Sequence, residues 1–327
     1  MSDKLADRTY SLLGRHGTPP SEYEIVSSRL HYYVGRGFEV NLPLGPWYER
    51  YQRGSPLQCA DWEAFADPAR TTYPQYTRTR KDAELDLDRV TAALDAAGAE
   101  LQLPPAWIST LGRSVPPLRY AFHGLHMVAS YVGQMAPSGR ITLAALFQSA
   151  DELRRIERIA YRMRHMQETR APEFGAHSKG EWQTAPAWQP LREAVERLLV
   201  AYDWGEAFVG LNLCLKPVLD EALVRCLAEE CQRQHDGCWT AVLESAYADC
   251  EWQRRWSAAL ARMAVAQNPD NRQVIARWLE LWTPRAFAAV GSVAGLFADA
   301  PVISRRLRSF HESYLAGALT PPGEHEP

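Results

Sequence analysis

A glutamate and a histidine three residues apart on a helix can bind one iron ion together, because one turn brings both side chains to the same face. The nearest approach to this spacing is Glu152, which is followed three residues later by Arg155. A guanidinium stays protonated and has no lone pair to offer, so Arg155 would repel a metal ion. No glutamate in the sequence is followed by histidine at this spacing. We therefore expect no catalytic, cofactor-binding or metal-binding residues in this chain.

The remaining candidate ligands are weaker. His123 and His126 lie three residues apart and could bind a metal, but no carboxylate in their helix joins them. We therefore expect a packed or hydrogen-bonded pair. Glu206, Glu244 and Glu251 lie on predicted helices and could be relics of ligand positions. Since no histidine shares their faces, we expect them to form salt bridges or to face solvent.

The cysteine pattern favours packing over metal binding or disulfides. The chain has six cysteines and no C-x-x-C pair. Five of them lie at uneven intervals across helical patterns, where a free cysteine usually packs as a small hydrophobic side chain in a reducing compartment. The cysteines are Cys59, Cys214, Cys226, Cys231, Cys238 and Cys250.

Composition indicates a globular protein with a sizeable core. The chain has 327 residues, 46% of them hydrophobic, and a net charge of −3. Acidic and basic residues are interspersed, which gives no basic surface for nucleic acid or an anionic membrane. The longest apolar run, 286–298, is shorter than the roughly 18 residues of a membrane span. The N-terminal residues lack the apolar core of a secretory signal, so we expect a cytoplasmic protein.

Two long amphipathic patterns lie between residues 116 and 170, joined by the breaker Ala136-Pro137-Ser138-Gly139. Apolar residues recur in both at spacings of three and four, so each predicted helix has one face to bury. The pattern predicts a helix hairpin in a large antiparallel bundle. The repeating residues are Leu118, Phe122, Leu125, Val128, Ala129 and Val132 in the first arm, and Leu143, Leu146, Phe147, Ala150, Leu153, Ile156 and Ala160 in the second.

Caps and prolines divide the rest of the chain into further helices. Asp203 should start a long helix that reaches Leu223 and kinks at Pro217. The last helix should span about 302–316. No strand pattern of any length occurs, so the sequence predicts an all-α fold. The other predicted helix starts are Ser178, Asp236, Asn268-Pro269 and Thr283-Pro284.

Residues 17–81 form a different kind of segment, with eleven aromatic residues and seven prolines but no lasting period. Such an arm usually lies over a surface that accepts its rings, which can be its own bundle or another subunit. We favour another subunit. The predicted organisation is an extended arm over residues 1–81, a helical domain over 82–317 and a polar tail over 318–327. The expected interface residues are Tyr23, Tyr32, Trp47, Tyr48, Tyr51, Trp62 and Phe65.

Several ordered motifs resemble the β (small hydroxylase) subunit of soluble di-iron multicomponent monooxygenases of the toluene and alkene class. The resemblance covers nearly the full chain except 81–113, which follows the family pattern poorly. The motifs are Pro20–Ser27, Leu30–Tyr32, Ser55–Leu57, Asp61–Pro68, Pro117–Tyr120, Gln134–Pro137, Ala160–Arg162, Asp203–Phe208, Arg255–Ser257 and Asn268–Asn271.

The resemblance implies a ferritin-like helical bundle that holds no iron itself. It implies pairing with a catalytic α subunit, which carries the di-iron site, and with a small γ subunit, in a hydroxylase with two copies of each. It also implies an effector protein, a ferredoxin and a reductase, and NADH- and O2-dependent hydroxylation or epoxidation of aromatic hydrocarbons or alkenes. The substrate itself, whether toluene, xylene, phenol or an alkene, stays open.

Two other functions compete with a non-catalytic subunit. A stand-alone ferritin-like metal oxidase would need at least four carboxylates and usually two histidines that converge, which the missing spacing disfavours. A general helical scaffold is disfavoured by the ordered motifs. The charge-dense stretch from Arg154 to Arg164 stays open between a solvated face and a contact with acidic groups of α.

Overall fold

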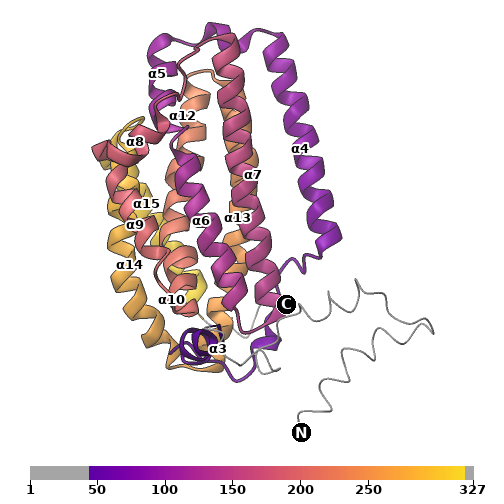
Figure 1. The fold of residues 1–327 in the computed structure, drawn as a ribbon, viewed down its shortest axis with the longest axis vertical. Helices are drawn as coiled ribbons and strands as arrows, with labels where there is room; N and C mark the ends of the chain where they lie inside the picture. The colour runs from indigo at the N-terminus through magenta and orange to yellow at the C-terminus, as the bar shows by residue number, and fades with distance from the viewer. Residues whose placement is uncertain (1–43, 321–327) are drawn as a thin grey trace, which may run out of the picture. The chain divides into compact units, whose positions relative to one another are not determined.

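The computed structural model describes residues 44–320, and most of them are helical (Figure 1). No strand occurs in this range, in agreement with the all-α prediction. The chain divides into two compact units, residues 1–54 and 55–327. The described part of the first unit consists of α3 (Leu44–Tyr48) and a π-helical turn, η2 (Glu49–Arg53). All further elements belong to the second unit, which is a helical bundle.

The predicted helix hairpin is present as α6 (Leu118–Met135) and α7 (Gly139–Thr169). Ser138 caps α7, since its hydroxyl accepts a hydrogen bond from the backbone N–H of Arg140 at 3.2 Å. The apolar face of α6 is buried as predicted. Gly124 lets α6 approach α9 (Gln189–Leu198) closely, because a Cβ at this position would collide with Val195. The hairpin is thus one wall of the bundle.

Two more long helices, α4 (Tyr73–Ala96) and α13 (Gly237–Gln267), lie beside α7 (Figure 1). The helix α13 packs on both α4 and α7. Asp236 caps α13 as predicted, because its carboxylate accepts a hydrogen bond from the N–H of Trp239 at 3.0 Å. The helix α4 begins inside the predicted 1–81 arm, since Thr72 and Gln75 form a capping box and a proline occupies the first turn.

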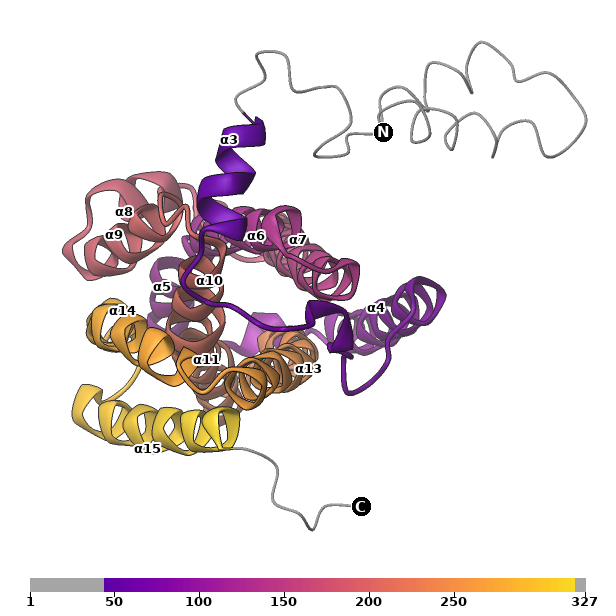
Figure 2. The same cartoon turned by 90° about the horizontal axis from the view of Figure 1, so that it is seen from below.

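The stretch that the sequence predicts as one helix kinked at Pro217 is a continuous run interrupted by two π-helices. Asp203 caps it as predicted, through the N–H groups of Gly205 and Glu206. Viewed from below, its first half lies between the α6–α7 hairpin and the C-terminal helices (Figure 2). Its elements are α10 (Trp204–Phe208), η6 (Val209–Leu215), α11 (Lys216–Asp220), η7 (Glu221–Cys226) and α12 (Leu227–Arg233).

Pro217 explains the π-helix before it. Proline has no N–H, so the carbonyl of Leu213, four residues earlier, loses its helical donor. His311 of α15 (Ala300–Leu319) replaces that donor, with its Nε2 atom 2.7 Å from the Leu213 oxygen. Burial lowers the pKa of His311, which favours a neutral ring that donates from Nε2. Tyr314 of the same helix donates to the carbonyl of Asn212 at 3.1 Å. Side chains of α15 thus complete a backbone that proline leaves unpaired.

The predicted helix start at Thr283-Pro284 is wrong. The helix α14 (Asn271–Ala294) continues through Pro284, because its buried apolar residues keep it packed on α9 and η6. The helix α8 (Ser178–Thr184) begins at Ser178, but its N-cap residue is His177 and no side chain caps it. Within residues 44–320, no helix is long and apolar enough to cross a membrane. The remaining elements are η3 (Trp62–Ala64), η4 (Ala99–Gln102), α5 (Pro105–Ser114) and η5 (Pro186–Trp188).

Candidate functional site

Four buried charged side chains meet inside the bundle, and we call them the core cluster: Glu152 and Arg155 on α7, and Lys216 and Asp220 on α11. Arg155 Nη1 lies 3.2 Å from Glu152 Oε2 and 3.0 Å from Asp220 Oδ1. Lys216 Nζ lies 2.5 Å from Glu152 Oε1 and 3.1 Å from Asp220 Oδ2. Each cation therefore bridges both carboxylates.

Helix geometry places these side chains. Glu152 and Arg155 are one turn apart on α7, and Lys216 and Asp220 are one turn apart on α11, so each helix presents one cation and one anion on a single face. The helix α13 closes the site, since Arg155 Nη2 lies 2.9 Å from Cys250 Sγ. The ring of Phe122 on α6 lies 5.5 Å below the same guanidinium. Four helices thus surround one pair of ion pairs.

The electrostatics of the core cluster favour the charged forms. Burial would raise the pKa of Asp220, but Lys216 and Arg155 outweigh it and hold that pKa below its usual range. Burial and Arg155 would lower the pKa of Lys216, but Asp220 and Glu152 outweigh them and raise it. Two positive and two negative charges therefore compensate one another in a buried region, where water cannot stabilise them.

A second layer of ion pairs joins α4 to this site. Arg80 of α4 contacts Asp151 at 2.6 Å and Asp249 at 2.8 Å. Arg154 contacts Asp249 at 2.6 Å, and Gln253 donates to Asp151 at 2.9 Å. Burial and the nearby Asp151 raise the pKa of Asp249 to about 6, against the opposing effect of the two arginines. The layer ties three long helices together through side chains.

The arginines of α7 resolve the question left open for residues 154–164. Arg154 and Arg158 both pair with Glu84 of α4, and Arg162 pairs with Asp95 near the end of the same helix. These three side chains are between 2% and 15% exposed, so most of this stretch is neither a solvated face nor a partner surface. Sequence periodicity shows that charges lie on one helix but not that a second charged helix packs against them.

The core cluster does not suit a di-iron site. Two carboxylates from neighbouring bundle helices face each other, as in carboxylate-bridged metal sites. Their oxygens, however, are already bound by an ammonium and a guanidinium, which cannot act as ligands and would repel a metal ion. The nearest further side chains are a thiol and an amide, and no imidazole lies among these contacts. We infer a structural ion-pair cluster at the position where a bundle of this kind could hold metal.

The structure places the expected interface aromatics in three groups. Tyr23 and Tyr32 lie outside the described residues. In the first unit, the rings of Trp47 and Tyr51 are 4.6 Å apart, and Tyr48 is buried.

The other two expected interface residues dock on this chain's own bundle. The Trp62 ring lies 5.0 Å from that of Trp204, edge to face. Phe65 is 1% exposed and lies against Trp256. The partner-contact expectation therefore fails for Phe65, because its ring is covered within the chain. The contact of Trp62 with Trp204 lies within the chain, which was the alternative to a contact with another subunit.

The two histidines form the packed pair that the sequence predicts, since the rings of His123 and His126 stack with centroids 6.0 Å apart. His126 Nδ1 lies 2.7 Å from the Ser149 hydroxyl, and His123 is exposed. Glu206 accepts a hydrogen bond from Trp282, and Glu244 and Glu251 are exposed. The five C-terminal cysteines are buried, as their helical context predicts.

Sequence reasoning found Glu152 and Arg155 but missed Lys216 and Asp220. A signal was present, because these are the first charged residues after Glu206 in an otherwise apolar helix, and they stand one turn apart. Opposite charges four residues apart inside an apolar stretch indicate a buried pair that needs partners from another helix.

Comparison with known proteins agrees with this architecture. The sequence profile described as Methane/Phenol/Alkene Hydroxylase matches residues 47–268. The hydroxylase component subunit beta of the toluene-4-monooxygenase system from Ectopseudomonas mendocina is 36% identical, over 85% of this chain and 87% of that protein. An oxygenase component of phenol 2-monooxygenase from Pseudomonas sp. strain CF600 is 26% identical, over 75% of each chain.

A solved structure shows the same fold. The structure of toluene 4-monooxygenase with toluene bound in its resting active site contains a chain that is 36% identical, with a TM-score of 0.78. The match covers 86% of this chain and 95% of that one. The chain therefore belongs to the methane, phenol and alkene hydroxylase family, as a β subunit of a di-iron multicomponent monooxygenase.

Proposed function

We propose that this chain is the iron-free subunit of its hydroxylase and that a separate α subunit carries the di-iron site. The observation that supports this most strongly is the core cluster, in which Arg155 and Lys216 already bind the carboxylates of Glu152 and Asp220. When bound in α, the di-iron group would supply the oxygen chemistry. This chain would supply a rigid bundle on which α assembles.

The family resemblance supports the rest of the assembly. We propose a hydroxylase with two copies each of α, this chain and a small γ subunit, served by an effector protein, a ferredoxin and a reductase. The named relatives act on toluene and on phenol, which supports aromatic hydrocarbons as the substrate class. Alkenes remain the alternative. Specificity would then depend on the cavity of α.

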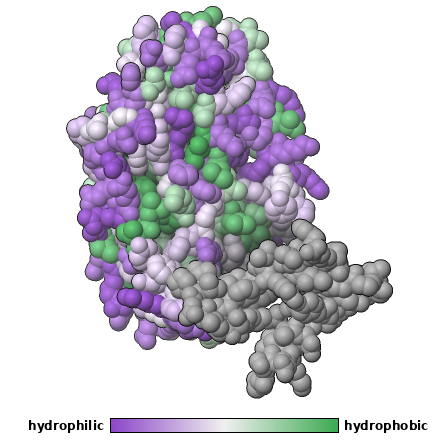
Figure 3. Space-filling model, in the orientation of Figure 1, coloured by the Kyte–Doolittle hydropathy of each residue, from purple (hydrophilic) through white to green (hydrophobic). Residues whose placement is uncertain are grey.

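The outward face of α7 supports a docking role. Four residues that sequence periodicity predicts to be buried are exposed: Leu143, Leu146, Ala150 and Leu153. Leu146 is 52% exposed and Tyr161, further along the same face, is 64% exposed. Figure 3 shows apolar residues on the side of the bundle that α6 and α7 form. A helix with apolar residues on both its inner and outer faces is typical of a subunit that buries the second face in a complex.

We propose that this α7 face docks on the α subunit, together with the arm aromatics Tyr23, Tyr32, Trp47 and Tyr51. The arm assignment rests on the aromatic composition of residues 17–81. Large aromatic rings that become buried in an interface usually contribute most of its binding energy.

The experiment is co-purification of the hydroxylase with single charged substitutions on this face. Leu153→Glu should release α, because a carboxylate would be buried without a partner. Leu281→Glu on α14 is the matched control, because both leucines are 40% exposed. Loss of α with Leu153→Glu alone, with helical circular dichroism unchanged in both, supports the proposal. Full retention of α with Leu153→Glu would refute this docking face.

A further inference from the structure

The surface between α13 and α15 is hollowed by a groove of about 590 Å³. We call it the basic groove, because three arginines of α13 line it: Arg254, Arg255 and Arg262. Figure 2 shows α15 on the opposite side of the bundle from α6 and α7. The basic groove is therefore separate from the α7 face. The residues of α15 that line it are Ser313, Tyr314 and Gly317.

The lining of the basic groove carries an excess of positive charge. Besides the three arginines it contains one carboxylate, that of Glu251. Glu251 is exposed and forms no ion pair with these arginines in the described part of the chain. The whole chain has a net charge of −3, so the local excess is opposite in sign to the total. A groove lined by one sign of charge attracts groups of the other sign.

Arg254 is held in a fixed position without an acceptor for all its donors. Its guanidinium carbon lies 4.9 Å from the centre of the Tyr247 ring and 5.4 Å from that of the Phe310 ring. The two rings hold the guanidinium through cation–π contacts. Its Nη1 atom is buried and has no hydrogen-bond acceptor among residues 44–320. Because buried polar groups normally have partners, Arg254 indicates an acceptor from outside these residues.

The other two arginines extend the site along α13. Arg255 is exposed and has neither an ion pair nor a hydrogen bond from its side chain within the described residues. Arg262 Nη1 donates to the carbonyl of Gly317 at 2.7 Å, which holds this side chain towards the end of α15. Arg254 and Arg262 are two turns apart, about 12 Å along the helix at 1.5 Å per residue. With both side chains held, they are not placed to converge on one small anion.

The length of the basic groove fits an extended peptide. An extended chain rises about 3.3 Å per residue, so two carboxylates four residues apart are separated by about 13 Å. The planar fork of arginine also matches a carboxylate, because it can donate two parallel hydrogen bonds to the two oxygens. Spacing and chemistry therefore favour two carboxylates on one chain over a single inorganic anion.

We propose that the basic groove binds an extended acidic segment of a partner protein other than α. One carboxylate of this segment pairs with Arg254 and Arg255, and a second lies beside Arg262. Since α15 and the α7 face lie on opposite sides of the bundle, the segment and α can be bound at the same time. The inference goes beyond the docking of α and does not depend on it.

A fluorescent peptide is the probe, with two glutamates four residues apart in a glycine and serine background. Its binding to the purified hydroxylase is measured by fluorescence anisotropy at low ionic strength, beside the same peptide with glutamines. The glutamate peptide should bind, and the glutamine peptide should not. Arg255→Gln should weaken binding about tenfold, the loss expected for one hydrogen bond between charged groups. Arg277→Gln on α14 is the matched control, because Arg277 is also exposed but lies outside the basic groove.

The control variant separates binding in the basic groove from attraction to the total charge. Equal weakening by both substitutions, equal binding of both peptides, or no binding of the glutamate peptide would overturn the proposal. Displacement of the bound peptide by inorganic phosphate as effectively as by unlabelled peptide would also overturn it, since the basic groove would then be a site for single anions. Both variants should retain helical circular dichroism and co-purified α. Loss of α with Arg255→Gln alone would mean that the basic groove contacts α rather than a different partner.

Discussion

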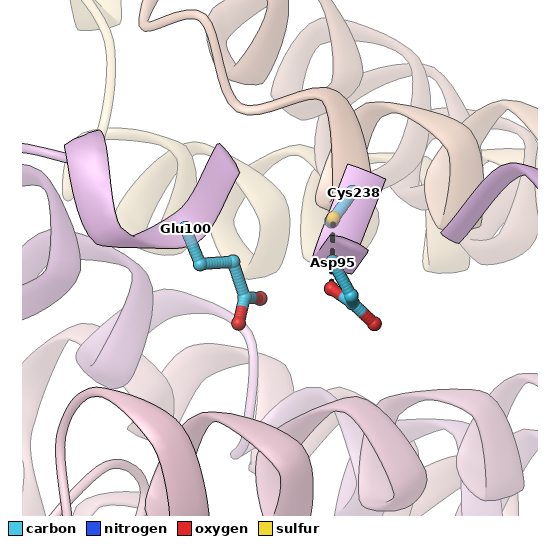
Figure 4. Close-up of side chains that lie close together, drawn as sticks. All are labelled: Asp95, Glu100 and Cys238. Carbon is cyan, nitrogen blue, oxygen red and sulfur yellow. Dashed lines mark hydrogen bonds between the residues drawn. The ribbon is translucent and has the colours of Figure 1, made fainter. Parts of the chain in front are cut away.

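The core cluster can be compared with a second group of polar side chains near the end of α4, the corner cluster, which consists of Asp95, Glu100, His165 and Cys238 (Figure 4). Both clusters place two carboxylates near the same long helix, α7, yet they differ in the cations that the chain supplies. In the core cluster, Glu152 and Asp220 are matched by Arg155 and Lys216. In the corner cluster, Asp95 and Glu100 are matched by one permanent cation, Arg162. The remaining neighbours there are an imidazole and a thiol. An arginine binds carboxylate oxygens in both clusters, but only the core cluster balances its two carboxylates with two permanent positive charges.

The largest effect should come from breaking the charge balance of the core cluster. Lys216→Met leaves two buried carboxylates with one cation, which should cost about 3 to 5 kcal/mol of unfolding free energy. The double variant Glu152→Gln/Lys216→Met keeps one cation and one anion, so it should recover most of that loss. Urea unfolding followed by circular dichroism measures both. Equal losses in the single and double variants would show that packing at Lys216, rather than charge, is responsible.

The second layer around the core cluster should respond to pH in its own direction. Folded Asp249 binds a proton below about pH 6, whereas an unfolded aspartate does so below about pH 3.9. Between these values the folded state holds more protons, so this group adds stability as the pH falls from about 6 to about 4. Asp220 has the opposite sign, because its pKa is lowered and its contribution is lost on acidification.

The variant Asp249→Asn isolates the contribution of Asp249 to the pH dependence of the unfolding free energy. The variant should lack the gain between about pH 6 and about pH 4 that wild type draws from Asp249. The measured quantity is the difference in unfolding free energy between variant and wild type across that range. A difference that does not change with pH would show that Asp249 stays ionised.

The smallest effect should come from Arg164, two residues beyond Arg162 on α7. Its side chain is 70% exposed and pairs only with Glu168 in the same helix. Arg164→Ala should therefore change the unfolding free energy by less than about 0.5 kcal/mol. Thermal unfolding of the variant beside wild type tests this. A loss comparable to that of the core variants would mean that the outer face of α7 is covered in solution.

Local patterns predicted the parts of the fold that local forces determine. The hairpin follows from periodicity and the breaker before Gly139, and Asp203 and Asp236 cap helices as their positions predict. The π-helix before Pro217 could not be predicted, because it depends on donors from His311, about a hundred residues later in the chain. The continuity of α14 through Pro284 likewise depends on tertiary packing.

In the candidate sites too, some features follow from local sequence and others depend on residues that are distant in the chain. The arginine at position 155, three residues after Glu152, was visible in sequence and predicted that Glu152 has no metal-binding partner there. The ion pairs that Lys216, Arg154 and Arg162 form with other helices were not visible, because those partners are distant in sequence. The corner cluster was missed altogether, since it combines four separate elements.

Iron analysis of the assembled hydroxylase that carries Glu152→Gln/Lys216→Met tests the central claim most directly. If the core cluster is a structural replacement for metal, iron per complex and the spectrum of the di-iron site should equal those of wild type. Loss of iron in proportion to the variant subunit, in a complex that remains assembled, would contradict the account and place iron ligands in this chain.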